Sequence, residues 1–320
     1  MNSSDVNIFA QIPGKSFLIT GADGFLGSEL VNFLLAQGAR VYGQVRSLDT
    51  LKRLSVDTDG LTLIPLNFCQ PDIDTFKAKL PEGIDCIIHA AAAGVRPNEN
   101  TWDVLSKVNI NGTQLMLETA VAKKAKRFIY IGSSFEYGDG DLWDESAVLR
   151  PRTLYGVSKT AGWMLTKCYA ETYQIPVVGF RPFYMYGPTE GKTRLISVVI
   201  HSAIEKQAIP MTLGEQERDF VYIDDVVRAL LYGAFELKAL GEMFNICTSE
   251  SISIRRAVGI MEEETTQVFP LIWGKLPYRT MEWVRLSGSG NKAKQLLGFS
   301  TRVRLREGLK KTYEHYVVKK

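Results

Sequence analysis

A tyrosine and a lysine, Tyr155 and Lys159, lie four residues apart in a stretch whose pattern predicts a helix over residues 155–173. This spacing puts the two side chains on one face of the helix. A free phenol has a pKa of about 10, and a nearby ammonium lowers that pKa because it stabilises the phenolate. The tyrosine can then give a proton to a carbonyl oxygen or remove one from an alcohol. Ordinary surface helices carry the same spacing, so the pair needs further support.

A hydroxyl group beside a predicted strand end supplies that support. Ser133 and Ser134 follow residues 128–131, a short apolar run that predicts a buried strand. Doubly wound α/β proteins keep their sites at the carboxyl ends of parallel strands. A serine hydroxyl there can hydrogen-bond the oxygen that gains or loses the proton. Together with Tyr155 and Lys159, it predicts an oxidoreductase site.

A glycine-rich turn indicates the redox partner. Gly21, Gly24 and Gly27 lie in the segment TGADGFLG, between a predicted strand at 17–20 and a predicted helix that begins with Phe25 and Leu26. Glycines at these positions permit a tight turn and the close approach of a pyrophosphate. The start of the helix directs unpaired N–H groups and a positive dipole end at that anion. The segment therefore predicts dinucleotide binding.

The residues after the second predicted strand, at 41–45, bear on which dinucleotide binds. NAD sites usually carry an acidic residue about 20 residues after the glycine turn. Here Arg46 and Ser47 take that place, and an arginine fork with a hydroxyl beside it suits a 2′-phosphate. We therefore expect NADP(H). NAD(H) is the alternative, through Asp49, which lies slightly later in the chain.

The elements that position these residues alternate along the first half of the chain. Strands are predicted at 17–20, 41–45, 61–66, 86–89, 128–131 and 177–180, and helical stretches lie between most of them. Such alternation predicts an α/β fold with a doubly wound parallel sheet of the Rossmann type. We expect a dinucleotide-binding domain over 10–181, rejoined by about 217–248. A smaller C-terminal lobe of 182–216 and 249–320 would bind the substrate.

Composition excludes several other classes of protein. The 320 residues include 38 basic and 35 acidic side chains, a formal charge of +3, with 45% apolar and 23% charged residues, as in an ordinary globular chain. No apolar run approaches the roughly 20 residues of a membrane span. The N-terminal segment does not resemble a secretory signal, so we expect a cytoplasmic protein. The four cysteines and three histidines lack metal-ligand spacing, so we expect no metal. The basic residues at 302–311 predict a solvated surface rather than nucleic-acid binding.

Several motifs resemble those of the extended short-chain dehydrogenase/reductases that act on nucleotide-activated sugars. They are TGADGFLG at 20–27, IIHAAA at 87–92, VNINGT at 108–113, GSSFEYG at 132–138, YGVSK at 155–159, RPFYMYGP at 181–188 and ERDFVYIDDV at 217–226. The resemblance covers nearly the whole chain, from about residue 15. It implies that Ser133, Tyr155 and Lys159 are catalytic. It also implies a homodimer formed through the helices at 155–173 and 111–123.

The same resemblance implies binding residues that spacing does not reveal. Cofactor contacts are implied for Asn67, Phe68, Ala90, Ala91, Ala92, Tyr155, Lys159, Pro182 and Phe183. Substrate contacts are implied for Ser133, Ser134, Phe135, Tyr184 and Arg218. Arg218 would bind the diphosphate of a sugar nucleotide, and its alternative is an ion pair with Asp219 or Glu217. Tyr184 stands where many relatives carry an asparagine, so the diphosphate contact would differ there.

Departures from the family narrow the expected reaction. Phe135 stands where the dehydratases and decarboxylases carry a glutamate, and where the fucose-synthesising type carries a cysteine. A phenyl ring cannot move a proton, which disfavours those activities. We predict NADPH-dependent reduction of a nucleotide-linked 4-keto-6-deoxyhexose, as in enzymes of CDP-dideoxyhexose synthesis, which resemble the GEQ-x-RDF run at 214–220. The alternatives are an NAD-dependent nucleotide-sugar 4-epimerase, a reductase of a non-sugar carbonyl and a non-catalytic NADP-binding protein.

One acidic residue near the predicted site has no assigned role. Glu136 replaces the apolar residue that relatives usually carry before the tyrosine at 137. We favour a solvent-facing side chain, and the alternative is a group that reaches the sugar.

Overall fold

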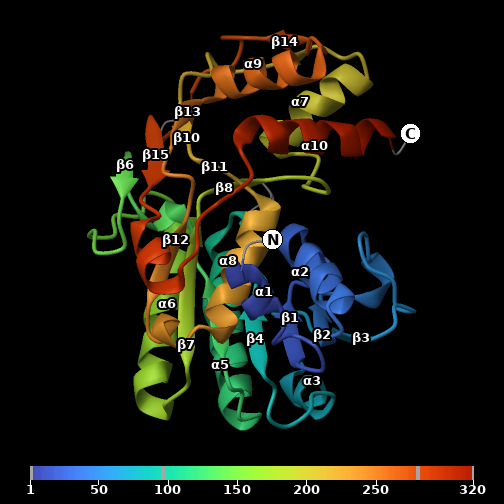
Figure 1. Cartoon of the computed structure of the whole chain (residues 1–320), viewed down its shortest axis with the longest axis vertical. Helices are drawn as coiled ribbons and strands as arrows, with labels where there is room; N and C mark the ends of the chain where they lie inside the picture. Colours follow the sequence, from blue (N-terminus) through green and yellow to red (C-terminus); the bar gives the residue numbers. More distant parts are fainter. Residues whose placement is uncertain (1–2, 95–98, 279–281, 319–320) are drawn as a thin grey trace.

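The fold is built on one seven-stranded parallel sheet (Figure 1). A computed structural model describes residues 3–94, 99–278 and 282–318 of the chain. In spatial order the strands are β12 (Met243–Ile246), β7 (Val177–Pro182), β5 (Phe128–Ile131), β4 (Cys86–His89), β1 (Ser16–Thr20), β2 (Arg40–Val45) and β3 (Leu61–Pro65). Every neighbouring pair is parallel. The predicted doubly wound α/β fold is confirmed.

Helices cover both faces of this sheet because its strands are apolar on both sides. Phe17 and Ile19 of β1 pack in one core cluster, while Leu18 between them packs in another. The first cluster contains residues of α1 (Ser3–Phe9), α2 (Phe25–Ala36) and α8 (Ile223–Phe235). The second contains residues of α3 (Ile73–Ala78), α5 (Gly112–Ala122) and α6 (Leu154–Tyr173). α4 (Trp102–Leu105) and the π-helix η3 (Ser106–Asn111) lead into α5.

A smaller lobe lies above the sheet in Figure 1. Its helices are α7 (Leu195–Ile204), α9 (Ile254–Thr265) and α10 (Leu305–Val318). One four-stranded sheet has the order β13 (Ile252–Ser253), β10 (Glu217–Arg218), β15 (Arg285–Gly288) and β6 (Gly140–Trp143). β8 (Tyr184–Tyr186) pairs with β11 (Phe220–Tyr222), and β9 (Ile209–Pro210) pairs with β14 (Leu271–Ile272). The described residues also form the short helices η1 (Leu48–Thr50), η4 (Ser134–Glu136), η5 (Leu237–Ala239) and η6 (Ala293–Leu297).

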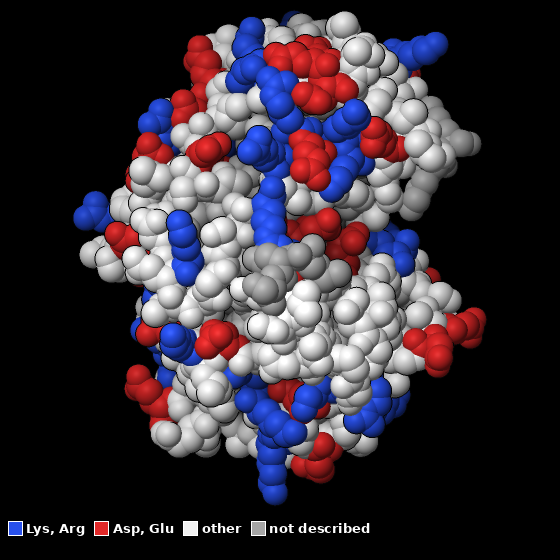
Figure 2. Space-filling view, viewed as in Figure 1, with Lys and Arg blue, Asp and Glu red and all other residues white. Residues whose placement is uncertain are grey.

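Charges of both signs alternate over the lobe (Figure 2). Arg306 pairs with Glu263 and Glu264 and so ties α10 to α9. Lys311 pairs with Glu307, one turn earlier on α10. Much of the basic stretch at 302–311 is therefore neutralised by neighbouring carboxylates. Separately, no helix in the described part of the chain is both long and apolar enough to cross a membrane.

Candidate active site

The glycine turn lies between the end of β1 and the start of α2. Gly21 has a φ of +63°, and a Cβ there would lie 2.9 Å from the Cα of Ala91. A Cβ at Gly27 would lie 2.1 Å from the carbonyl oxygen of Gly21. Within the described residues, no side chain caps α2 at Gly24, so the first N–H groups of the helix, from Phe25 onward, face the turn. This backbone cradle has the room and the dipole that a diphosphate needs.

Two polar side chains that the sequence analysis missed hold the turn in place. Gln44, at the end of β2, accepts the Gly21 N–H at 2.8 Å and donates to the Leu66 carbonyl at 2.7 Å. Asp23, within the turn, accepts the N–H groups of residues 52–54 at 2.7 to 3.0 Å. Gln44 had a detectable signal, because it is a polar residue in an otherwise apolar strand.

The residues expected to bind a 2′-phosphate have partners within the protein. The Arg46 Nη2 atom lies 3.2 Å from Glu99 Oε1, with the two side chains 65% and 13% exposed. The Ser47 hydroxyl caps η1 by accepting the Asp49 N–H and donates to the Asp49 carboxylate at 3.1 Å. The charge of Arg46 and the hydroxyl of Ser47 are thus both engaged.

The other implied cofactor residues follow β3 and β4. Asn67 accepts a backbone N–H in the turn after β3, and the ring of Phe68 is buried in the core. Residues 90–92 follow β4, and Ala91 donates its N–H to the Thr20 hydroxyl at 3.0 Å. These residues therefore line the same end of the sheet as the glycine turn.

Ser133, Tyr155 and Lys159 come together beyond the end of β5. Ser133 is the residue just before η4, where its hydroxyl accepts the Phe135 N–H at 3.2 Å, and it lies close enough to Tyr155 of α6 to lower the pKa of that phenol. Lys159, one turn further along α6, is buried and donates from Nζ to the Ile131 carbonyl at 2.7 Å. The predicted trio is therefore assembled by two elements, one short and one of 20 residues.

Burial shifts the pKa values of Tyr155 and Lys159. It raises the pKa of Tyr155 to about 12, against the opposing effects of the Ser133 hydrogen bond and the Arg194 charge. This direction is opposite to the lowering expected from Lys159. Burial also lowers the pKa of Lys159 to about 8, and the Glu136 carboxylate opposes that change. The lysine therefore remains largely cationic at neutral pH.

Glu136 is buried, and the interpretation of a solvent-facing side chain is wrong. Its side chain is 0% exposed, and its Oε2 atom lies 2.9 Å from Nε of Arg181 in β7. Its Oε1 atom accepts the Ser133 N–H at 2.8 Å. Arg181 in turn donates to the Tyr137 hydroxyl at 3.0 Å. Sequence analysis missed this network because its members lie 44 and 45 residues apart.

Aromatic side chains form one wall beside Tyr155. Phe135 stacks on Trp283 with ring centroids 4.4 Å apart and meets Tyr155 edge-on at 6.0 Å. Ser134 is buried next to Phe135 in η4. Pro182 ends β7, and the ring of Phe183 is buried in the same small core as Trp283. The group nearest Tyr155 on this side is thus a phenyl ring.

Two arginines lie around Tyr184. The guanidinium of Arg194 lies 5.1 Å from the centroid of the Tyr184 ring. Sequence analysis missed Arg194. Arg218 is buried, donates to the Trp283 carbonyl at 3.0 Å and pairs with the Glu282 carboxylate. Its carboxylate partner is therefore neither Asp219 nor Glu217. Both positive charges lower the pKa of Tyr184, which burial raises overall.

A buried asparagine, also missed, links the two halves of the site. The Asn109 side chain accepts the Ala93 N–H at 2.8 Å and donates to the Ala93 carbonyl at 3.1 Å. It also donates to the Ser158 hydroxyl at 2.9 Å. Asn109 thereby ties the loop after β4 to the turn of α6 that carries Lys159. It belongs to the motif at 108–113, whose spacing indicated no side-chain role.

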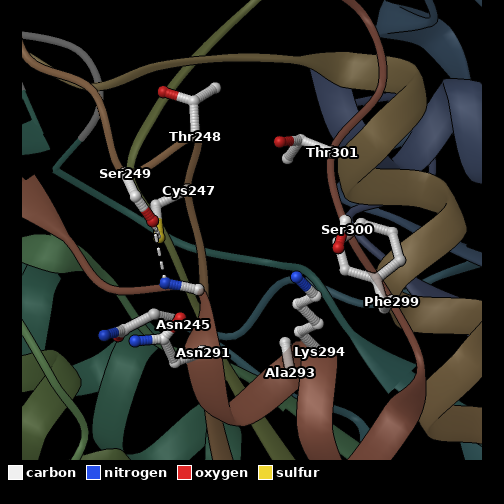
Figure 3. Close-up of a pocket in the computed structure, with 11 residues that line it drawn as sticks. Asn245, Cys247, Thr248, Ser249, Asn291, Ala293, Lys294, Phe299, Ser300 and Thr301 are labelled. Atoms are coloured by element: carbon white, nitrogen blue, oxygen red, sulfur yellow. Dashed lines mark hydrogen bonds between the residues drawn. The ribbon is translucent and has the colours of Figure 1, made fainter.

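A separate pocket of about 120 Å³ opens beside the end of β12. Thr248 and Ser249 lie on one side of it, and Lys294 and Thr301 lie on the other (Figure 3). The Gly290 N–H donates to the Ser249 hydroxyl at 3.0 Å on the Ser249 side of the pocket. None of the site residues predicted from the sequence lines this pocket. Within the described residues, no cluster of three or more His, Cys, Asp or Glu side chains could hold a metal ion.

Comparisons with known proteins bear on the chemistry of this site. Residues 17–247 match the family described as the NAD dependent epimerase/dehydratase family. A Bacillus subtilis protein named as an uncharacterized UDP-glucose epimerase is 31% identical over 314 residues, covering 91% of this chain and 95% of that protein. MoeE5 in complex with UDP-glucuronic acid and NAD is 29% identical with a TM-score of 0.85, covering 95% of this chain and 99% of that one. The UDP-glucuronic acid 4-epimerase of Bacillus cereus, solved with the same two ligands, is 27% identical with a TM-score of 0.84, covering 95% and 100%.

These comparisons contradict the predicted NADP(H), because the similar solved structures hold NAD. The structure supplies a physical reason for the error. A 2′-phosphate would have to compete with the Glu99 carboxylate for Arg46, and with Asp49 for the Ser47 hydroxyl. An arginine after β2 is therefore not by itself a sign of NADP.

Proposed function

The chain belongs to the NAD dependent epimerase/dehydratase family, and we propose that it is an NAD-dependent 4-epimerase of a UDP-linked hexose or hexuronic acid. One observation carries this proposal. Ser133 lies beside Tyr155, and the side chain that meets Tyr155 from η4 is the phenyl ring of Phe135. Tyr155 is then the group with which the site moves a proton at the sugar. The dehydratases that this chain resembles carry a glutamate at the position of Phe135, and dehydration needs that carboxylate.

The backbone and side chains around the glycine turn fit a bound dinucleotide. Gly21, Gly24 and Gly27 leave space that any Cβ would fill, and the start of α2 supplies N–H groups. NAD held there would accept the sugar hydride and return it. Arg46 is paired with Glu99, so a 2′-phosphate would have to displace that carboxylate, whereas NAD would not.

The residues of the trio then have distinct tasks. Tyr155 takes the proton from the 4-hydroxyl when the sugar is oxidised and returns it when the sugar is reduced on the opposite face. Ser133 holds the 4-oxygen in reach of Tyr155. Lys159 supplies the positive charge that a phenolate needs on the same face of α6. Arg218 and Arg194 lie near Tyr184, where each would exchange its carboxylate partner for the diphosphate of the substrate.

The expected homodimer is also a proposal, supported by exposed apolar side chains on α5 and α6. Leu154, Val157 and Met164 of α6 are 50%, 39% and 46% exposed, and Val121 of α5 is 37% exposed. Their spacing places them on the outer side of the two helices that the family resemblance implies. Sedimentation should give a dimer for the natural chain and a monomer for Met164→Glu. A monomeric natural chain would contradict the proposal.

The epimerase is tested by NMR in D₂O. The protein is incubated with NAD and either UDP-glucose or UDP-glucuronic acid, with Tyr155→Phe as a matched control. We expect the 4-epimer to appear with its H4 proton retained, no deuterium in the ring and no net absorbance at 340 nm. Deuterium at C3 or C5 would indicate a different proton transfer and would contradict the assignment.

A second assay distinguishes a reductase from the epimerase. Reduction of a nucleotide-linked 4-keto-6-deoxyhexose stays a prediction that no comparison bears out. Arg46 no longer supports it, because the expected NADP(H) is contradicted. Stoichiometric consumption of NADPH or NADH with such a 4-keto sugar, and no epimer from either UDP-sugar, would favour it over the epimerase.

A further inference from the structure

The segment after β5 brings a carboxylate into the interior of the site. Glu136 ends η4 and is 0% exposed. Its Oε1 atom accepts the Ser133 N–H at 2.8 Å, while the Ser133 hydroxyl caps the same turn from the other side. A Cβ at Gly132 would lie 2.2 Å from Oε1, so the turn needs glycine to let the carboxylate reach this position. The backbone of the catalytic serine is thus bonded to Glu136.

The opposite side of this carboxylate is also fixed. Arg181 Nε lies 2.9 Å from Oε2, and Arg181 Nη1 donates to the Tyr137 hydroxyl at 3.0 Å. The Tyr137 hydroxyl donates a hydrogen bond to Asn245 Oδ1 at 2.9 Å. Well-packed apolar side chains of similar volume are often as stable as a buried ion pair. The burial of this pair is therefore weak evidence that its role is stability alone.

The charge of Glu136 faces the groups that move the proton. The ionisable groups around it are Arg181 of β7, Tyr130 of β5, Tyr137 after η4, and Tyr155 and Lys159 of α6, with Arg194 of α7 also acting on Tyr155. The carboxylate raises the pKa of Lys159 against the effect of burial, and it adds to the raised pKa of Tyr155. Burial raises the pKa of Glu136 itself, and Arg181 opposes that change most strongly.

We propose that Glu136 is a positioning residue that orients the Ser133 hydroxyl toward Tyr155 and sets a fixed negative charge opposite Lys159. The proposal rests on the proposed epimerase for its kinetic consequences only. The mechanism has two parts. The Oε1 bond to the Ser133 N–H fixes the serine backbone just before η4, and the bond from the Phe135 N–H fixes its hydroxyl. The negative charge keeps Lys159 an ammonium in a site that excludes water.

The first experiment needs no substrate. The chain is labelled with ε-¹³C lysine, the Lys159 signal is assigned by its loss in Lys159→Met, and its titration is followed by NMR. In Glu136→Gln, which keeps an oxygen for the Ser133 N–H, we expect the Lys159 midpoint to fall by about one pH unit. Asp5→Asn is the matched control, since Asp5 is a buried carboxylate that pairs with Arg228 and Arg302 away from the site. The midpoint should not move in that control.

The second experiment uses turnover of the UDP-sugar. In Glu136→Gln we expect kcat to fall about tenfold or more with KM within about twofold, and both limbs of the pH profile to move to lower pH. A purely structural role would lower the rate without moving the profile. If no nucleotide sugar turns over, the epimerase fails while the NMR titration still tests Glu136.

A second variant covers the case in which Glu136→Gln fails to fold. Glu136→Gln with Arg181→Met removes both buried charges and leaves neither unpaired. The Lys159 midpoint should fall in this double variant as well. An unchanged midpoint in a folded variant, with the pH profile in its original place, would overturn the proposal.

Discussion

Two arginine–glutamate pairs lie at opposite ends of the site, and they differ in burial. Arg46 follows β2 and meets Glu99 at 3.2 Å, with side chains 65% and 13% exposed. Arg181 lies in β7 and meets Glu136 at 2.9 Å, with side chains 3% and 0% exposed. The first pair borders the predicted cofactor residues, and the second supports Ser133, the proposed catalytic serine.

Because the two pairs differ in burial, they can have different roles. An exposed pair is screened by water and contributes about 0–1 kcal/mol, so a ligand can compete with it. A buried pair has lost its water, so neither charge can leave without a large cost. The pair of Arg46 can therefore tune which ligand binds. The pair of Arg181 can only hold the geometry and the electrostatics of the reaction.

The largest expected effect lies at the catalytic end, where Tyr155→Phe removes only the phenol hydroxyl. We expect turnover of the UDP-sugar to fall by about 10²–10⁴-fold because Tyr155 is the group proposed to move the proton at the sugar. Calorimetric affinity for NAD should stay within about twofold of that of the natural chain. An equal loss of affinity would break the comparison, since the two ends would then not act separately.

A second large effect is expected on stability. Arg181→Met leaves the Glu136 carboxylate buried without its cation, and we expect the free energy of unfolding to fall by about 3–5 kcal/mol. Arg46→Met is the matched control and should change that free energy by less than about 0.5 kcal/mol. Urea unfolding of both variants at pH 7 gives the comparison. Similar losses in the two variants would show that burial does not distinguish the pairs.

The features that sequence analysis predicted correctly are local ones. The glycine turn, the alternating strands and the Tyr155–Lys159 spacing each occupy a few neighbouring residues, so the backbone pattern alone brings their parts together. Both ion pairs were missed because each joins residues far apart, 53 positions for Arg46 and 45 for Arg181. Arg46 was misinterpreted for this reason, since its neighbours in sequence contain no carboxylate that contacts it.

A histidine between the two ends predicts a pH dependence. The Thr20 hydroxyl accepts the Ala91 N–H and lies 2.8 Å from His89 Nδ1. On the other side of the ring, His89 Nε2 lies 3.1 Å from the Thr113 hydroxyl. That hydroxyl donates to the Asn109 carbonyl. This pattern assigns a neutral ring with its proton on Nε2. Burial lowers the pKa of His89 to about 3 from its ordinary 6.5.

The sign of the effect follows from proton binding. Between pH 6.5 and 3 the unfolded chain protonates this histidine and the folded chain does not, so stability is lost as the pH falls through that window. We expect His89→Gln to lose less stability than the natural chain between pH 7 and 4.5, by about 2–3 kcal/mol. Urea unfolding at several pH values measures this difference. Parallel losses in the two proteins would contradict the neutral assignment.

The smallest effect expected is at the exposed pair, and it concerns selectivity. Glu99→Gln removes the charge that opposes Arg46, so the guanidinium becomes available to a 2′-phosphate. We expect NADP affinity to rise about tenfold relative to NAD, by calorimetry, with the free energy of unfolding unchanged within about 0.5 kcal/mol. Adding Arg46→Met to Glu99→Gln should abolish the gain. If the gain survives without Arg46, the NADP preference is set elsewhere, and the exposed pair has no part in choosing the cofactor.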